Sequence, residues 1–142
     1  SRVARYAIKR NILEQFLKQV YYNQDKVSEA LIDRYYDLFT REGNPQVFFE
    51  MANAKFEENT HKLKGIEAQT LLMWGRHDKW IPVDNAYRFE RRIQHSEILI
   101  YENCGHLPME EIPRQSANDV RAFLLGKVDM EVRQMKSRTV IV

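Results

Sequence analysis

The sequence predicts an α/β fold, with parallel strands flanked by helices and a helical segment in front of them. Two observations carry this prediction. The first third of the 142-residue chain has apolar residues at helical spacing and almost no strand pattern. From residue 70 onward, the pattern runs in the order strand, helix, strand, helix. This order is typical of parallel strands joined by a right-handed crossover.

The composition is that of an ordinary globular domain, with 44% apolar and 30% charged residues. The net charge of +2 arises from 22 basic and 20 acidic residues, so we expect neither a nucleic-acid partner nor a membrane surface. No apolar run approaches the ~20 residues of a membrane span. The first residues lack signal-peptide character, and the single Cys104 cannot form an internal disulfide. We therefore expect a cytoplasmic location.

Three helices are expected in the first third. The first covers residues 1–19, where apolar residues recur at three- and four-residue intervals. Ser28 is a suitable N-cap for the second helix, and Gly43 a suitable end for it. Asn44 is expected to cap the third helix, with a proline in its first turn. The second helix carries a wide apolar stripe: Leu31, Ile32, Tyr35, Tyr36 and Phe39.

The α/β part follows a polar connection at residues 57–69. Residues 70–74 predict a strand buried on both faces, and residues 97–101 a second strand. Residues 84–93 between them have a helical pattern, and a final helix opens at Pro113. Its expected buried stripe comprises Ala117, Val120, Phe123 and Leu124. Because two parallel strands make a poor independent sheet, we expect the back end of a larger sheet with a helical insertion before it.

Two residues capable of catalysis follow the predicted strands. Asp78 lies just after the first strand and His106 just after the second. The carboxyl ends of parallel strands meet at one edge of a sheet, which is where ligands bind in open α/β folds. A carboxylate beside an imidazole fixes its tautomer and stabilises its charged form. The pattern therefore favours an acid and a base of one active site.

Two motifs carry a family resemblance. Gly-Arg-His-Asp-Lys-Trp-Ile-Pro-Val at 75–83 and Asn-Cys-Gly-His-Leu-Pro-Met-Glu-Glu-Ile-Pro at 103–113 resemble the last two motif blocks of the α/β-hydrolase fold superfamily. The helical first third is similar, more loosely, to the caps of monoacylglycerol-lipase-like and small esterase members. The resemblance implies that Asp78 is the triad acid and His106 the triad histidine.

The same resemblance implies three regions. Residues 1–60 correspond to an α-helical cap and residues 61–126 to the C-terminal part of the hydrolase core. Residues 127–142 form a tail. None of the five serines has the Gly-x-Ser-x-Gly context of the family nucleophile. We therefore expect the nucleophile upstream of this chain, and we expect this chain alone to be inactive.

The implied activity is hydrolysis of a small apolar carboxylic ester by a Ser-His-Asp triad, with no cofactor. One alternative is an epoxide hydrolase or haloalkane dehalogenase with an aspartate nucleophile. Another is a non-catalytic receptor or scaffold of the same fold, against which the presence of both Asp78 and His106 argues. The expected partners are the N-terminal half of the fold and, through an exposed sheet edge, a second copy of the chain.

Other residues have competing interpretations. Trp80 and Leu107 are candidates for the substrate pocket, although Trp80 could equally pack within its loop. Cys104 is read as a small buried residue rather than a nucleophile, and His77 as a loop residue. No histidine has partners at metal-ligand spacing, so no metal site is expected. The tyrosine pairs at 21–22 and 35–36 resemble cap tyrosines that donate protons in epoxide-opening members of the family, or could be ordinary packing. The cluster Phe48, Phe49 and Met51 could face an acyl chain, or could simply pack the cap.

Overall fold

The computed structural model describes residues 9–55 and 59–126. The first part is helical, as predicted, and a 3₁₀ turn links its first two helices. These elements are α1 (Arg10–Val20), η2 (Gln24–Lys26), α2 (Glu29–Thr40) and α3 (Asn44–Asn53). The predicted first helix began at residue 1, and residues 1–8 lie outside the described residues, as does the tail 127–142.

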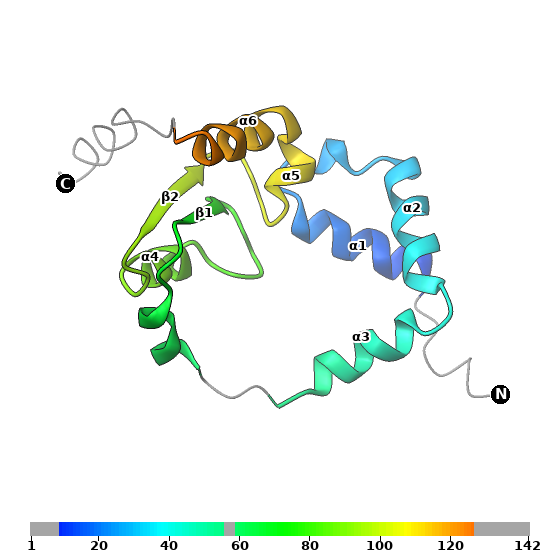
Figure 1. Ribbon diagram of the computed structural model, residues 1–142. Helices are drawn as coiled ribbons and strands as arrows, with labels where there is room; N and C mark the ends of the chain where they lie inside the picture. The colour runs from blue at the N-terminus through cyan, green and yellow to red at the C-terminus, as the bar shows by residue number, and fades with distance from the viewer. Residues whose placement is uncertain (1–8, 56–58, 127–142) are drawn as a thin grey trace.

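The second part contains the sheet. Its elements are η3 (Thr60–Gly65), β1 (Thr70–Gly75), α4 (Asp84–Glu90), β2 (Ser96–Tyr101), α5 (Pro108–Glu111) and α6 (Pro113–Leu124). The strands β1 and β2 pair in parallel, with Leu72 opposite Ile98, which confirms the predicted arrangement. In Figure 1, α5 lies between α6 and the end of α1, so the segment after β2 connects the sheet to the helical part.

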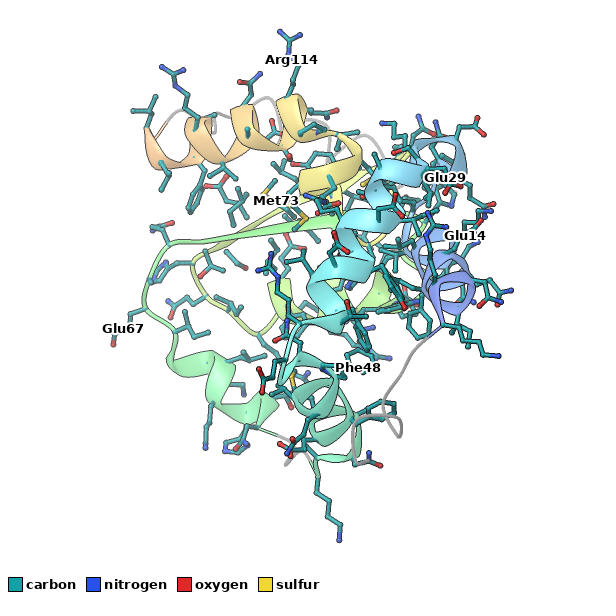
Figure 2. The ribbon with its side chains drawn as sticks, turned by 90° about the vertical axis from the view of Figure 1, so that its right-hand side faces the viewer. Glu14, Glu29, Phe48, Glu67, Met73 and Arg114 are labelled. Atoms are coloured by element: carbon teal, nitrogen blue, oxygen red, sulfur yellow. The ribbon has the colours of Figure 1, made fainter. Side chains whose placement is uncertain are left out.

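The main core cluster belongs to the helical part. It comprises Leu13, Leu17, Val20, Tyr21 and Ile32, all under 9% exposed. α1 and α2 therefore pack through the faces that the apolar periodicity predicts. Arg10 of α1 also bonds Asp33 and Glu29 of α2 at 2.7 and 2.5 Å, and Figure 2 shows Glu29 at the outer surface. A second set of buried residues surrounds the strands: Ala86, Ile93, Ile98, Tyr101 and Cys104.

Local capping confirms one prediction and corrects two others. The Ser28 hydroxyl accepts the Leu31 N–H at 3.2 Å, as an N-cap does. Gly43, with φ of 86°, is the N-cap of α3 rather than the end of α2, which stops at Thr40. Asn44 lies inside α3 and does not cap it. Its side-chain amide donates to the carbonyl of Leu38 at 2.7 Å. Glycine is suited to this link because its missing Cβ permits positive φ.

Four sequence predictions about the second part are wrong in detail. β1 is only half-buried, because β2 is its single strand neighbour among the described residues. α4 ends at Glu90 rather than at residue 93, and the connection at 57–69 contains η3. The predicted stripe of α6 is largely exposed: Ala117, Val120 and Leu124 face outward, and Leu124 is 75% exposed. Ser116 is the buried residue of α6, at 3% exposure.

Exposed apolar side chains, membrane-spanning helices and metal-ligand clusters are three features that would indicate a function. Val47, Phe48 and Met51 of α3 are 52%, 42% and 61% exposed, and Figure 2 shows Phe48 toward the lower end of the molecule. Within residues 9–55 and 59–126, no helix combines the length and apolar character that crossing a bilayer requires. In the same residues, no three histidine, cysteine or acidic side chains gather where they could hold a metal ion.

Candidate active site

The loop after β1 holds Asp78 in a fixed position. The Asp78 Oδ1 atom accepts the N–H groups of Trp80 and Ile81, each at 2.9 Å. The Trp74 indole N–H donates to the carbonyl of Ile81 at 2.9 Å and ties the far side of the loop to β1. Asp78 is 8% exposed. Its carboxylate is therefore buried, bonded and pre-oriented before any partner approaches.

The loop after β2 lies directly against the first loop. The N–H of His77 donates to the Cys104 carbonyl at 3.0 Å. Arg76 and Glu102 form an ion pair at 2.7 Å across the two loops. A Cβ on Gly75 would lie 1.9 Å from the Gly105 carbonyl oxygen, which no side chain permits. A glycine at position 75 is thus required for the two loops to approach so closely.

This packing brings the two predicted catalytic residues together. The Nδ1 atom of His106 lies 2.7 Å from Oδ2 of Asp78, across 28 residues of sequence. Because a carboxylate oxygen accepts, we assign the imidazole proton to Nδ1, which leaves a lone pair on Nε2. Nε2 has no hydrogen-bond partner within the described residues, and the His106 side chain is 29% exposed. An imidazole held by a buried carboxylate at one nitrogen, with the other nitrogen free, has the geometry that general-base chemistry requires.

An aromatic wall extends from this pair to the cap. The Trp80 ring centroid lies 5.6 Å from that of His106. On its other side, Trp80 meets Phe16 of α1 edge-to-face at 5.1 Å. Trp80 and Phe16 are 43% and 38% exposed, so Trp80 offers apolar surface beside the histidine and Phe16 extends that surface from α1. Leu107, the other residue predicted for the pocket, packs instead against the core cluster of α1 and α2.

From the sequence, Phe16 is only a member of the apolar stripe of its helix. Its partner Trp80 is 64 residues away in the chain, and helical periodicity contains no information about such a pair. The other candidate residues have structural partners. The His77 ring stacks on Tyr22 at 4.3 Å. Cys104 is fully buried, and desolvation, with the Glu111 charge next, raises the pKa of its thiol to about 12.

Glu110 joins the cap to the segment that follows His106, a contact that the sequence analysis missed. Its carboxylate accepts the Tyr35 hydroxyl at 2.8 Å and the Tyr21 hydroxyl, and it pairs with Arg34 at 2.9 Å. Burial and the bond to Glu110 raise the pKa of Tyr35 to about 12 and also raise that of Tyr21. Burial works to raise the Glu110 pKa, but these three donors together lower it. Tyr21 and Tyr35 thus bond the helical cap to α5, which follows His106.

Comparison with solved structures identifies the fold. The chain is similar to a crystal structure of a serine hydrolase involved in carbazole degradation, the CarC enzyme, with a TM-score of 0.69 and 28% identity. That alignment covers 84% of this chain and 48% of the other. The chain has the α/β-hydrolase fold, and it corresponds to the C-terminal part of that fold with its helical cap.

Curated relatives are hydrolases of the α/β-hydrolase fold superfamily, although no family model matches the sequence. A 2-hydroxy-6-oxononadienedioate/2-hydroxy-6-oxononatrienedioate hydrolase of Pseudomonas putida is 32% identical over 90 residues, which are 61% of this chain and 32% of that protein. Monoacylglycerol lipase ABHD6 of Mus musculus is 31% identical over 80 residues, 56% of this chain and 24% of the lipase. The chain therefore spans about a third or less of the length of these relatives.

Proposed function

We propose that the complete protein containing this chain is a serine hydrolase, in which His106 is the general base and Asp78 its orienting acid. The observation that carries the proposal is the 2.7 Å contact between His106 Nδ1 and an Asp78 carboxylate held by two backbone N–H groups. The serine of the triad lies outside this chain. The resemblance of both loops to the hydrolase motif blocks supports the assignment.

The chemistry then follows from the geometry. The serine hydroxyl approaches Nε2 of His106 and transfers its proton there as its oxygen attacks the substrate carbonyl. The imidazolium that forms is stabilised by Asp78, which cannot turn away because Trp80 and Ile81 hold its other oxygen. His106 next protonates the leaving group, and a water molecule repeats the cycle to release the acid. No step needs a cofactor.

We assign a carboxylic ester with an apolar acyl group as the substrate class. The exposed faces of Trp80 and Phe16 support this choice, because they place aromatic surface within reach of the base. The similarity to monoacylglycerol lipase ABHD6 points in the same direction. Trp80 is the pocket residue in this proposal, and Phe16 extends the same wall from the cap.

A second candidate is cleavage of a carbon–carbon bond in a 2-hydroxy-6-oxo-dienoate. The specific observation in its favour is the similarity to 2-hydroxy-6-oxononadienedioate hydrolases, which include the 32% identical relative from Pseudomonas putida. The same acid and base serve both reactions, so the chain's own pair does not separate them. A substrate with two carboxylates would also need cationic partners, which the aromatic wall does not supply.

The test is a steady-state assay of the complete protein on two substrate types. p-Nitrophenyl esters of increasing acyl length report ester hydrolysis, and a 2-hydroxy-6-oxo-dienoate reports carbon–carbon cleavage. We expect the highest kcat/KM on an ester of medium or long acyl chain, and loss of that activity in His106→Ala with an unchanged Tm. Turnover of the dienoate alone would favour the second candidate, and equal ester activity in His106→Ala would refute the role of His106.

A further inference from the structure

Glu111 is a buried carboxylate that the proposed reaction does not use. It lies at the end of α5, five residues after His106, and is 2% exposed. Burying a carboxylate is costly unless hydrogen-bond donors replace the water that it loses. A residue of this kind in a loop beside the catalytic histidine therefore needs a structural explanation.

Four donors converge on the Glu111 side chain. Its Oε1 atom accepts the Gly105 N–H at 2.6 Å and faces the Cys104 thiol at 3.6 Å. Its Oε2 atom accepts the N–H groups of Tyr22 and Asn23 at 2.9 and 3.3 Å. Both oxygens act only as acceptors. A glutamine would turn an NH₂ group toward at least one of these donors, so the site is specific for a carboxylate.

The same two segments also hold the backbone of His106. The His106 N–H donates to the Val20 carbonyl at 2.9 Å. Successive amides, of Gly105 and His106, are thus bonded to Glu111 and to the end of α1. The fit is close, because a Cβ on Gly105 would lie 2.3 Å from the Val20 carbonyl oxygen and 2.9 Å from Glu111 Oε1. The turn before His106 therefore has little freedom to shift.

We propose that Glu111 is a positioning residue for His106. It holds the turn at 104–106 against residues 20–23, so that the imidazole keeps its contact with Asp78. This inference rests on the proposed function for its kinetic consequence, but the positioning itself concerns only residues of this chain. It also implies that the cap segment after α1 is part of the support of the active site and does not move independently of His106.

The chain offers a matched pair of variants. Glu111→Gln keeps the shape of the side chain and loses its acceptor at one or more of the backbone N–H groups. Glu110→Gln, at the adjacent position of α5, loses the charge and one of the two oxygens that bond Tyr21, Tyr35 and Arg34 of the cap, and it changes no contact to the turn before His106. Both weaken the attachment of α5 to the cap. Only the first acts on the turn at 104–106.

Two readouts are made on the complete protein. The first is the low-field proton resonance of the His106 Nδ1–H in NMR, which reports the contact with Asp78 and needs no turnover. The second is the division between kcat and KM on the best ester. In Glu111→Gln we expect the resonance to move or broaden and kcat to fall by about 10²-fold, the effect of a small misplacement, with KM near that of the wild type. Glu110→Gln should leave the resonance and kcat unchanged.

The outcomes separate the possibilities. A resonance at the wild-type position in Glu111→Gln would overturn the inference even if the variant were less stable, and so would an equal shift in both variants. Absence of hydrolysis by the wild type would refute the proposed function, while the resonance would still test the positioning.

If Glu111→Gln does not fold, hydrogen exchange of the wild-type protein decides. The amides of Gly105, Tyr22 and Asn23 share one carboxylate, so they should be protected and exchange at similar rates. An unprotected Gly105 amide beside protected Tyr22 and Asn23 amides would overturn the inference.

Discussion

At the scale of single residues, Asp78 combines two roles in one side chain. One oxygen orients His106, and the other closes its own loop by accepting the Trp80 and Ile81 amides. An asparagine at this position keeps the volume but has only one accepting atom. It must either present an NH₂ group to His106, which selects the wrong tautomer, or present it to the loop amides.

Asp78→Asn should therefore lower kcat by about 10⁴-fold, by analogy with the same change in serine proteases. The measurement is single-turnover kinetics of the complete protein. Asp37→Asn, at an exposed position of α2, is the matched control and should retain wild-type activity. Activity of Asp78→Asn close to that of the control would remove Asp78 from the triad.

The Cys104 thiol provides a prediction about alkaline pH. In the unfolded chain it titrates near its ordinary value of 9.0, and burial raises its pKa in the folded chain to about 12. The folded state therefore keeps a proton that the unfolded state loses, so this contribution to stability is complete below pH 9.0 and is lost as the pH rises toward about 12. Denaturant unfolding should show a smaller decline over this range in Cys104→Ala than in the wild type. The same decline in unfolding free energy with pH in both proteins would contradict the burial of the thiol.

At the scale of elements, the N-cap of α2 has a definite energetic role. The Ser28 hydroxyl satisfies the Leu31 N–H, one of the donors that a helix start leaves without a partner. α2 in turn presents Ile32, which is 1% exposed, to the main core cluster. Loss of the Ser28 hydroxyl should therefore reduce the stability of the helical part without changing the loops that hold Asp78 and His106.

Ser28→Ala should lower the free energy of unfolding by about 1 kcal/mol, measured from urea midpoints. Ser28→Asn retains an acceptor and should remain close to the wild type. The activity of the complete protein should be the same in all three. A stability loss in Ser28→Asn equal to that in Ser28→Ala would show that the hydroxyl does not act as a cap.

Local signals explain which elements could be predicted from the sequence. Ser28, the apolar run of β1 and Pro113 each mark an element through its own residues, and the structure places α2, β1 and α6 there. The contact between Asp78 and His106 was predictable because parallel topology brings successive strand ends together. Glu111 was not, because its partners Tyr22 and Asn23 lie almost 90 residues earlier and no local pattern records them.

The predicted face of α6 failed for a related reason. Helical spacing indicates that one side is apolar, but the side that is buried depends on the neighbouring elements. In the structure, Asp119 of α6 accepts the Tyr101 hydroxyl at 2.8 Å, and Ser116 bonds the Pro113 carbonyl. The bond to Tyr101 places Asp119 on the side of α6 that faces the sheet, where Ser116 is buried at 3% exposure, and Val120 and Leu124 are left exposed. Periodicity therefore predicted the helix correctly and its orientation wrongly.

At the scale of the whole molecule, the sheet has free edges. Each strand has one neighbour among the described residues, so the outer sides of β1 and β2 remain unpaired. Leu124 and Leu125, at the end of α6, add exposed apolar surface at 75% and 56%. Unpaired strand edges and apolar surface both promote association between chains.

Expressed by itself, the 142-residue chain should self-associate, with a mass above 17.0 kDa that rises with concentration. Sedimentation equilibrium measures this directly. Replacing Leu124 and Leu125 together by glutamate should weaken the association. Gln94→Glu with Gln115→Glu adds the same two charges at exposed polar positions, removes no apolar surface and serves as the surface control. A monomer at every concentration would contradict the prediction.

The central claim is that Asp78 and His106 activate a serine outside this chain. Its most direct test is the rate at which a fluorophosphonate probe labels the complete protein, with mass spectrometry of the tagged peptide. The account predicts rapid labelling of one serine outside residues 1–142 and a loss of this labelling in folded His106→Ala. Absence of labelling in the folded wild type, or labelling that is equally fast without His106, would contradict it and would favour an aspartate nucleophile or a protein that binds its ligand without reaction.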